Sequence, residues 1–460
     1  MGTILLKHAQ AIVSCDAHDT VYKDADLLID GPRILQIGPS LSAPADAQAI
    51  DCTGKILYPG LVNTHHHFFQ SFVRNISRIE CYNMSLLEWL DKIYRIFVRL
   101  NEEDIYYASL TAMSDLLKHG CTTAFDLQYC YTPYTGYKPI DLQMQAAAEL
   151  GMRFHAGRGV NTLPRRLGST MPDGMVETTE GYLQDAERLI RTYHDASPYS
   201  MRQIVLAPCQ PTNCYEETFV KSVQLARDAG VRLHTHLAEG ENPAMQAKYG
   251  MRSLAWCEQH GFIGEDDWYA HCWELTDDEY KCLADHGSGI SHCPEAAMLA
   301  GVNILPLKRL KELGVPVGLG CDGSATNDGS SMLSCIRIGF LLQAYHCKQR
   351  GGSVSAYDLL RAATVNGAKL LGRTDIDSLE AGKAADLFAI DASKLDMVGA
   401  VHDPKDLLGR VGYQNEVSMT MVNGQVVFQD GKLLRVDERS LASKAEQVCR
   451  QLLSQVPGIL

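Results

Sequence analysis

Residues 61–70 read Leu-Val-Asn-Thr-His-His-His-Phe-Phe-Gln and follow an apolar run that ends in Tyr58-Pro59-Gly60. Side chains of a strand alternate between its two faces, so His65 and His67 are expected on one side and His66 on the other. Two imidazoles at one strand end can bind one metal ion, and imidazole suits zinc, iron, copper or nickel. A strand with incidental surface histidines is the alternative, because a histidine pair is a weak motif by itself.

Outward from this stretch, short apolar runs alternate with segments of helical length. Seven further runs follow it, at 122–128, 153–160, 204–210, 232–239, 268–273, 289–294 and 317–324. The segments between them have helical patterns, among them 216–229, 244–260 and 277–286. Buried strands that alternate with helices are typical of a parallel sheet of the α/β class. Eight such units predict a (β/α)8 TIM barrel over residues 59–375.

The two ends of the chain have a different pattern, of short strands and turns. Residues 3–58 contain several β-type runs, and β-type sequence returns at 385–390 and 418–428. Asn423-Gly424 is a hairpin turn signal within the last of these. We therefore expect residues 1–58 and 376–460 to build one small composite domain, a β-sandwich, outside the barrel. A helix over 438–454 is expected to complete this domain.

The composition narrows the classes of function. Of the 460 residues, 46% are hydrophobic and 21% are charged, as in globular proteins, and the net charge is −13. An acidic chain is a poor partner for nucleic acid, so a small neutral or cationic ligand fits better. No apolar run approaches the roughly 20 residues that span a bilayer, and the start of the chain lacks a signal-peptide layout, so we expect no membrane association and a cytoplasmic location. The 15 cysteines form no Cys-x-x-Cys pair, which predicts reduced thiols.

Metal-ligand and acid–base residues gather at the ends of four of the predicted strands. In chain order they are His65, His67, His236, Glu239, His271 and Asp322. Barrel enzymes place their sites at the carboxyl ends of the strands. We therefore expect these side chains to meet at one rim, since each polar residue scattered through an apolar barrel would need a partner of its own.

The same residues carry a resemblance to a known family. The motifs are the run 59–67, His236-Leu237-Ala238-Glu239, His271, His292-Cys293-Pro294 and the run 320–324. In order and spacing, over nearly the whole chain, they resemble the amidohydrolase superfamily, in its cytosine-deaminase-like and triazine-hydrolase-like branch. Residues 63–70, 188–195 and 206–209 are similar to the 8-oxoguanine deaminase group in particular.

The resemblance implies one divalent metal ion, with zinc as the first choice and iron as the alternative. Carried over residue by residue, it implies that the ligands are His65, His67, His236 and Asp322. A catalytic metal with an open position lowers the pKa of bound water to about 7. Asp322 would take a proton from that water, Glu239 would act as general acid on a ring nitrogen, and His271 would stabilise the attacking oxygen. Because Glu239 lies three residues after His236, it reaches the same side only if the chain turns there.

Four further residues are candidates for substrate binding: Gln70, Trp89, Arg158 and Cys209. The resemblance implies that Gln70 contacts an amide-like edge of the substrate, to which its side chain offers both a donor and an acceptor. Trp89 lies near the start of an amphipathic helix. Its side chain is expected either in the helical core or in the wall of the pocket. Arg158 either meets a substrate carbonyl or forms a buried ion pair. Cys209 is expected to line the pocket, because nothing indicates the lowered pKa that a thiol nucleophile needs.

The resemblance implies a hydrolase of C–N bonds in cyclic amidines. The expected reaction is deamination of an aminated nitrogen heterocycle of the 8-oxoguanine, guanine, isocytosine or pterin type, with release of ammonia. The alternatives are an aminohydrolase of triazines or N-alkylamino heterocycles, a cyclic-amide hydrolase and, outside the enzymes, an inert barrel that serves as a binding module. A homo-oligomer is expected by analogy. Gln128 and the segments 240–242 and 295–297 differ from the family pattern, so the identity of the ring stays open.

Overall fold

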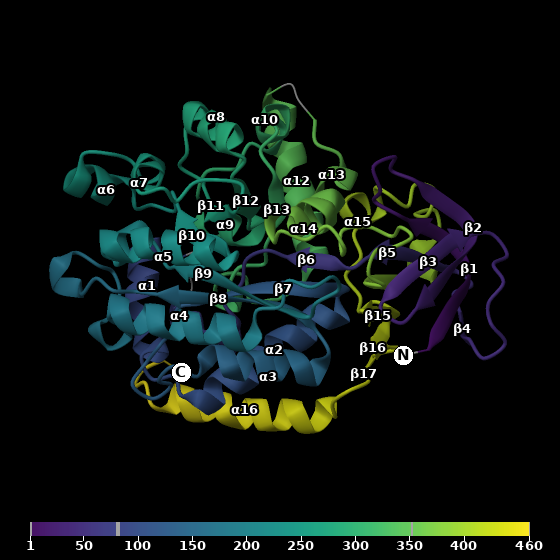
Figure 1. Ribbon diagram of the computed structural model, residues 1–460, viewed down its shortest axis with the longest axis horizontal. Coiled ribbons are helices and arrows are strands. Elements are labelled where there is room, and N and C mark those ends of the chain that lie inside the picture. The colour runs from purple at the N-terminus through teal and green to yellow at the C-terminus, as the bar shows by residue number, and fades with distance from the viewer. Residues whose placement is uncertain (1, 80–82, 351–352, 460) are drawn as a thin grey trace.

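The computed structural model describes residues 2–79, 83–350 and 353–459. Its larger part is a barrel of eight strands, in which each strand pairs in parallel with the next one along the chain (Figure 1). The strands are β6 (Leu61–Asn63), β7 (Cys121–Gln128), β8 (Arg153–Val160), β9 (Arg202–Pro208), β10 (Arg232–Leu237), β11 (Asp267–His271), β12 (Gly289–His292) and β13 (Val317–Leu319). The (β/α)8 barrel predicted from the sequence is confirmed.

Hydrogen bonds between the segments after β6 and β13 bring the first and last strands together. The Thr64 N–H donates to the Leu319 carbonyl at 3.0 Å, and the Asp322 N–H donates to the His65 carbonyl at 3.0 Å. β6 itself ends at Asn63, earlier than the sequence predicts. His65 therefore belongs to the segment that follows the strand, and this segment is held directly against the residues after the last strand.

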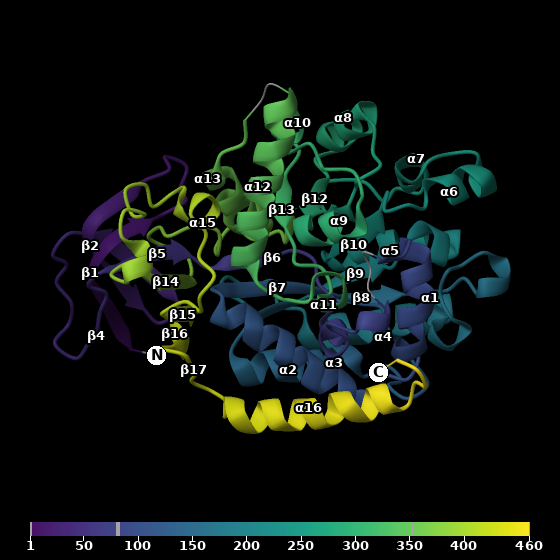
Figure 2. The ribbon, with the colours of Figure 1, turned by 180° about the vertical axis from the view of Figure 1, so that it is seen from behind.

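Helices cover the outside of the barrel (Figures 1 and 2). They are α1 (Leu86–Phe97), α2 (Glu102–Lys118), α3 (Pro139–Leu150), α4 (Thr179–Tyr193), α5 (Glu216–Ala229), α6 (Asn242–Tyr249), α7 (Ser253–Gln259), α8 (Asp277–His286), α9 (Pro294–Ala300), α10 (Leu307–Leu313), α11 (Ser324–Asn327), α12 (Met332–Arg350), α13 (Ala356–Arg361) and α14 (Gly367–Leu370). The single helix predicted over 244–260 is two helices, α6 and α7. Gly250 ends the first with a left-handed φ of +69°, which is a common way for a helix to stop.

Strands from both chain ends form one mixed sheet of nine strands beside the barrel. They are β1 (Thr3–Val13), β2 (Val21–Asp30), β3 (Arg33–Gly38), β4 (Gln48–Asp51), β5 (Lys55–Pro59), β14 (Leu387–Asp391), β15 (Met419–Val422), β16 (Gln425–Gln429) and β17 (Lys432–Leu433). β5 joins the two ends, because it pairs in parallel with β1 and antiparallel with β14. As the sequence predicts, the two ends of the chain share one β-structure outside the barrel.

A buried ion pair connects the barrel to this sheet. Arg153, the first residue of β8, donates from Nε and Nη2 to the two carboxylate oxygens of Asp386, each at 3.0 Å. Neither side chain is exposed to solvent. Asp386 also accepts the backbone N–H of Asn423 at 2.6 Å, which ties in the β15–β16 turn. A bidentate pair of this kind fixes orientation, and loss of one partner would leave a buried charge without compensation.

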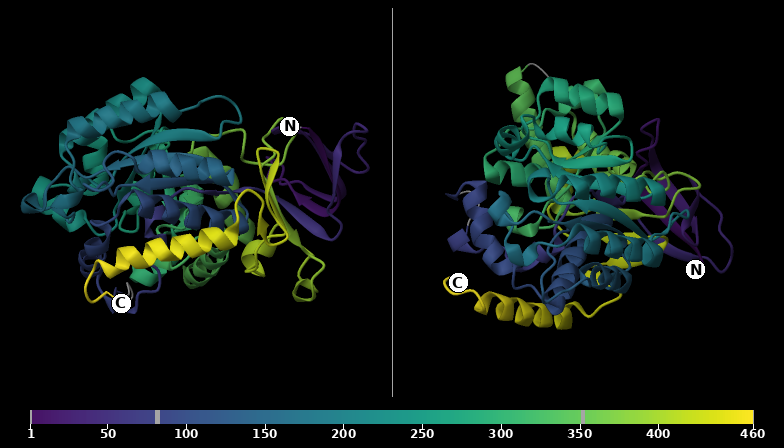
Figure 3. Two further views of the ribbon diagram at one scale, coloured as in Figure 1. Left: turned by 90° about the horizontal axis from the view of Figure 1, so that it is seen from below. Right: turned by 60° about the vertical axis from the view of Figure 1, so that its left-hand side comes forward.

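The C-terminal helix lies on the barrel, which corrects the expectation that it completes the small domain. α16 (Glu438–Ser454) has the predicted bounds, but it runs along α2 on the outside of the barrel (Figures 1 and 3). Its buried residues Ala445, Val448 and Leu452 pack in the same apolar cluster as Trp89 and Ile105. An amphipathic pattern specifies that a helix has a buried face but not which neighbour covers that face.

Two expectations from composition concern the whole chain. The fourteen cysteines in the described residues are all free thiols, most of them buried, whereas Cys81 lies outside the described residues. This agrees with the predicted absence of a disulfide framework. Among the helices that the structure describes, none is both long enough and apolar enough to cross a membrane.

Candidate metal centre and active-site cavity

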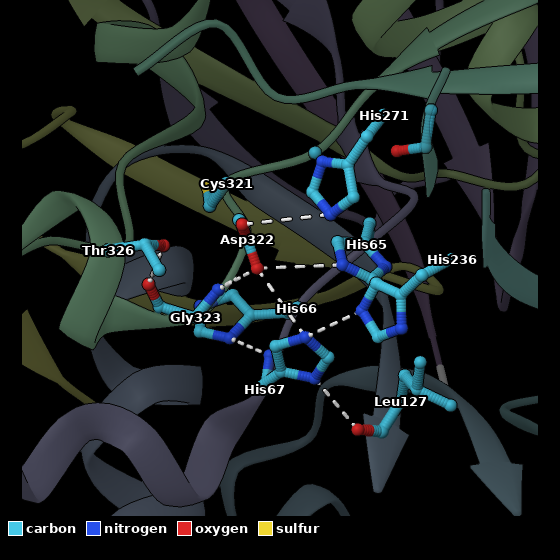
Figure 4. A network of polar contacts seen from close by, with 12 residues as sticks. His65, His66, His67, Leu127, His236, His271, Cys321, Asp322, Gly323 and Thr326 are labelled. Carbon is cyan, nitrogen blue, oxygen red and sulfur yellow. Dashed lines mark hydrogen bonds and ion pairs between the residues drawn. The ribbon is translucent and has the colours of Figure 1, made fainter. Parts of the chain in front are cut away.

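Five side chains from four strand ends converge at the carboxyl ends of the barrel strands (Figure 4). His65 and His67 follow β6, His236 lies in β10, His271 ends β11 and Asp322 follows β13. All five are buried. The structure thus brings together the residues that the sequence places at one rim.

Left-handed backbone conformations redirect the chain at three of the strand ends. Ala238, His271 and Asp322 have φ values of +52°, +74° and +64°, which residues other than glycine rarely adopt. Backbone bonds hold these turns, among them the bond from the Cys272 N–H to the Leu237 carbonyl at 2.9 Å. Strained residues of this kind persist only where the surrounding structure determines them, and they cluster at functional sites.

The hydrogen bonds of His67 and His236 assign a tautomer to each ring. His67 Nδ1 lies 2.9 Å from the Leu127 carbonyl oxygen, and His236 Nδ1 lies 2.8 Å from the Cys209 carbonyl oxygen. A carbonyl can only accept, so each Nδ1 carries the proton and each Nε2 carries the lone pair. The two Nε2 atoms are 3.2 Å apart. Two lone pairs at this separation repel each other unless a cation or a proton lies between them.

His65 is oriented in the same way, through a second histidine. His234 Nδ1 lies 2.8 Å from the Trp268 carbonyl, so this nitrogen donates and His234 Nε2 accepts. His65 Nδ1 lies 3.0 Å from His234 Nε2 and therefore donates to it. The remaining nitrogen, His65 Nε2, is buried and has no hydrogen-bond partner among the described residues.

Asp322 completes a set of donors that fits a divalent metal ion. Its Oδ1 lies 3.5 Å from the Nε2 atoms of both His65 and His67, and its Oδ2 lies 4.0 Å from His271 Nε2. Burial lowers the pKa of His65, His67 and His236, so all three rings are neutral at pH 7. Three neutral imidazoles and one carboxylate around a common point form a site of the kind that zinc or iron occupies.

Glu239 reaches the same site because the chain turns after β10. Its Oε1 lies 3.4 Å from His271 Nε2, although regular strand geometry would point it away from His236. The left-handed residue Ala238 makes this turn. Burial, followed by the charges of Asp322 and Glu241, raises the pKa of Glu239 well above its usual value. A raised pKa favours the protonated form of a carboxyl group, which is the form that acts as a general acid.

A cavity of about 600 Å³ opens onto these residues. Its volume is within the range of pockets for small molecules. Trp89, Leu90, Tyr94 and Tyr129 provide aromatic and aliphatic walls, and His67, His236, Glu239, His271 and Asp322 line the polar end. The cavity therefore combines aromatic and aliphatic walls with a cluster of carboxyl and imidazole groups.

Three of the four predicted substrate-binding residues line this cavity. Gln70 accepts the Ala325 N–H through its Oε1 at 3.3 Å, which leaves its amide nitrogen for a ligand. Trp89 both lines the cavity and packs in the core, so its two alternative positions are compatible. Cys209 also lines the cavity, and burial raises the pKa of its thiol well above the usual value, which argues against a nucleophilic role.

Arg158 does not line the cavity, which corrects its candidacy as a substrate-binding residue. Its guanidinium is fully buried and lies 2.7 Å from a carboxylate oxygen of Glu177 and 2.7 Å from one of Asp185. It also stacks on the ring of Tyr131 at 3.6 Å. The alternative considered for this residue, a buried ion pair, is the one found, because two acids on the following loop and helix take up all its charge.

Two relationships near the site had no signal in the sequence. His234 is a hydrogen-bonded core residue, and nothing in the sequence indicates that its partner is His65. The carboxylate of Glu241 accepts the N–H groups of Ala238 and Glu239, and only the observed left-handed turn makes this contact possible.

Comparisons with known proteins agree with this arrangement. A model of the amidohydrolase family matches residues 56–427. The chain is 44% identical to hydroxydechloroatrazine ethylaminohydrolase of Pseudomonas sp. strain ADP over 98% of this chain and 96% of that protein. It is 34% identical to 8-oxoguanine deaminase of Pseudomonas aeruginosa over 99% of this chain and 100% of that protein. The solved structure of atrazine chlorohydrolase TrzN from Arthrobacter aurescens TC1, complexed with zinc, matches with a TM-score of 0.92 and 31% identity over 97% of this chain and 100% of that one. The motifs, the barrel and these relatives lead to one conclusion: the chain belongs to the amidohydrolase family.

Proposed function

We propose that this chain is a metal-dependent hydrolase that removes an exocyclic amine from an aminated nitrogen heterocycle. The observation that carries the proposal is the position of Glu239, whose carboxyl Oε1 lies 3.4 Å from His271 Nε2 at the polar end of a cavity with aromatic walls. An acid at this place is required to protonate a ring nitrogen during deamination. The names of the relatives, which include deaminases and aminohydrolases of heterocycles, support the same class of reaction.

We propose zinc as the metal, held by His65, His67, His236 and Asp322, with iron as the alternative. The donor set suits both ions, and a related triazine hydrolase structure is described as complexed with zinc. When bound in such a site, zinc supplies Lewis acidity and a water of lowered pKa. The protonated Nδ1 atoms of the histidines keep their Nε2 lone pairs directed at the ion.

The remaining steps belong to the side chains of the protein. Asp322 accepts the proton that water releases as its oxygen adds to the ring carbon bearing the amine. Glu239 donates its carboxyl proton to the neighbouring ring nitrogen, and His271 stabilises the negative charge that develops on the added oxygen. The proton that Asp322 holds then passes to the amine as the C–N bond breaks. The hydroxyl proton of the added oxygen returns to Glu239 as the carbonyl forms, so both carboxyl groups end in their starting states. Trp89 and Tyr94 pack against the ring and exclude bulk water.

Two groups of substrates are supported by specific observations. A purine-like or pterin-like ring with a primary amine, as in 8-oxoguanine, is favoured by the polar amide of Gln70 at the cavity wall. An N-alkylamino triazine is favoured by the 44% identity to an ethylaminohydrolase and by apolar lining from Leu90, Met171 and Val302, which would accommodate an alkyl group. Both require the same cleavage of a C–N bond, and they differ in the ring and in the amine released.

The test is release of amine by zinc-loaded protein from a panel of compounds. The panel contains 8-oxoguanine, guanine, isocytosine, isoxanthopterin, an N-ethylamino hydroxytriazine and two cyclic amides, with chromatography of the product alongside detection of ammonia and ethylamine. We expect one aminated heterocycle to react with a kcat/KM at least about 100-fold above the others, within the range typical of enzymes. Hydrolysis of a cyclic amide without release of amine from any heterocycle would refute the proposal.

A further inference from the structure

The side chain of Glu241 binds the backbone of the turn that precedes it. Its Oε1 accepts the Ala238 N–H at 2.6 Å and its Oε2 accepts the Glu239 N–H at 2.7 Å. Gln210 Nε2 donates to the same Oε2 at 3.4 Å. Glu241 is 7% exposed, and in the part of the chain that the structure describes no Lys, Arg or His forms an ion pair with it. The carboxylate is therefore bound by two consecutive backbone amide groups, and the side chains of Gln210 and Ser253 are its further partners.

This arrangement is specific to the turn and not a feature of the following helix. Glu241 directly precedes α6, where it accepts the Met245 N–H through its backbone carbonyl. A side chain in this position commonly caps the first turn of its own helix. Here the side chain makes no capping bond and instead bends back to the segment after β10.

The turn that Glu241 binds is the turn that delivers Glu239 to the cavity. Ala238 has a φ of +52°, a left-handed conformation that is strained for a residue with a side chain, and Gly240 follows with a φ of +124°. Adjacent N–H groups can point at one carboxylate only when the backbone departs from the strand, where successive N–H groups point in opposite directions. The carboxylate thus stabilises the strained conformation and is not accommodated by the extended one.

We propose that Glu241 is a positioning residue for Glu239: its carboxylate, bound across the N–H groups of Ala238 and Glu239, holds the left-handed turn that directs the Glu239 carboxyl group at His271 and the substrate ring. This inference rests on the proposed function, because it assigns to Glu239 the role of proton donor. A displacement of about 1 Å at a reacting group costs roughly 100-fold in rate. Glu241 also lines the cavity, but its two carboxylate oxygens are bound to the turn, so substrate affinity should change little.

The experiment measures kcat and KM per bound zinc for the wild type, Glu241→Ala and Glu241→Gln. Glu241→Ala removes both acceptors, so we expect kcat to fall about 100-fold with KM within about threefold of the wild type. Glu241→Gln keeps the shape of the side chain and one acceptor oxygen, so it should lose less activity than Glu241→Ala. If the alanine variant does not fold, the kinetics of the glutamine variant test the inference. Zinc content should remain at the wild-type level in both variants.

Two controls separate positioning from a general effect on folding. Asp16 makes a comparable contact in the small domain, where its Oδ1 accepts the N–H groups of His18 and Thr20 at 3.0 and 2.9 Å. Asp16→Asn should lower the thermal stability without changing kcat per bound zinc. In a Glu239→Gln background, Glu241→Ala should cause no further loss, because the group it positions is no longer an acid.

The possible results distinguish failure of the role proposed for Glu241 from failure of the proposed function. If the wild type releases no amine from any heterocycle, the proposed function fails. If the wild type is active but Glu241→Ala and Glu241→Gln retain its kcat per bound zinc, Glu241 is not a positioning residue. An undiminished effect of Glu241→Ala in the Glu239→Gln background would also overturn the inference, since the residue would then act by another route.

Discussion

His65 Nδ1 lies 3.0 Å from His234 Nε2, and this bond connects the metal centre to the backbone of β11 through the Trp268 carbonyl. Only one proton arrangement satisfies both bonds when the two rings are neutral. It places the lone pair of His65 on Nε2, the atom that faces Asp322. His234 therefore sets the tautomer of a proposed metal ligand without touching the metal site itself.

The first prediction concerns this relay. His234→Phe keeps an aromatic ring in the buried position but removes the acceptor, so the affinity for zinc should fall by about 10- to 100-fold. Competition with a chelator measures that affinity directly. His155→Phe is the matched control, because His155 is a buried barrel histidine whose two ring nitrogens have no hydrogen-bond partner among the described residues. Equal zinc affinities for the two variants and the wild type would remove His234 from its assigned role.

A second prediction separates metal binding from proton transfer. Glu239→Gln preserves the size of the side chain but cannot donate an acidic proton, so zinc content should be retained while kcat falls by a factor of about 100 to 10,000. Elemental analysis and steady-state kinetics on the same preparation provide both values. Turnover close to that of the wild type would show that another group is the general acid.

The barrel and the convergence of the histidines and Asp322 at one rim were predictable because each depends on a local pattern. Apolar runs with helical segments between them specify parallel strands. Polar residues at the ends of these strands lie at one rim of the barrel even when the predicted strand ends are wrong by a residue or two. The sequence could predict that Glu239 reaches the site if the chain turns after His236, but it could not predict the turn itself. The turn depends on the left-handed conformation of Ala238. Neither the contact of α16 with α2 nor the partners of Arg158 could be predicted, since both depend on which surfaces meet in three dimensions.

Arg158 allows a third prediction, on stability. Arg158→Met leaves the Glu177 carboxylate without its cation and leaves Asp185 with only Arg188, so the free energy of unfolding should fall by about 3 kcal/mol. The enzyme that remains folded should bind substrate normally, because Arg158 lies outside the cavity. Thermal unfolding and KM test both statements. A KM raised tenfold or more with an unchanged melting temperature would restore the substrate-binding role.

A fourth prediction uses the pH dependence of stability. Burial alone would raise the pKa of Asp375, but its hydrogen bonds to Arg373 and the nearby charge lower it to about 2 in the folded protein, from 3.8. A depressed folded pKa contributes stability above pH 4 that is lost as the pH falls towards 2. Asp375→Asn should therefore cost about 2 kcal/mol at neutral pH. The difference in melting temperature between variant and wild type should be constant from pH 8 to about 5 and narrow below about 4. A difference that widens in acid would contradict the assignment.

The central claim, that one metal ion at this site drives hydrolysis of an exocyclic C–N bond, is tested most directly by titrating metal-free protein with zinc while measuring amine release. The account predicts that activity rises in proportion to added zinc and saturates at one ion per chain. His236→Ala, which lacks one of the two facing Nε2 lone pairs, should bind no stoichiometric zinc and gain no activity. Amine release by the metal-free protein, or by His236→Ala at the wild-type rate, would contradict the claim.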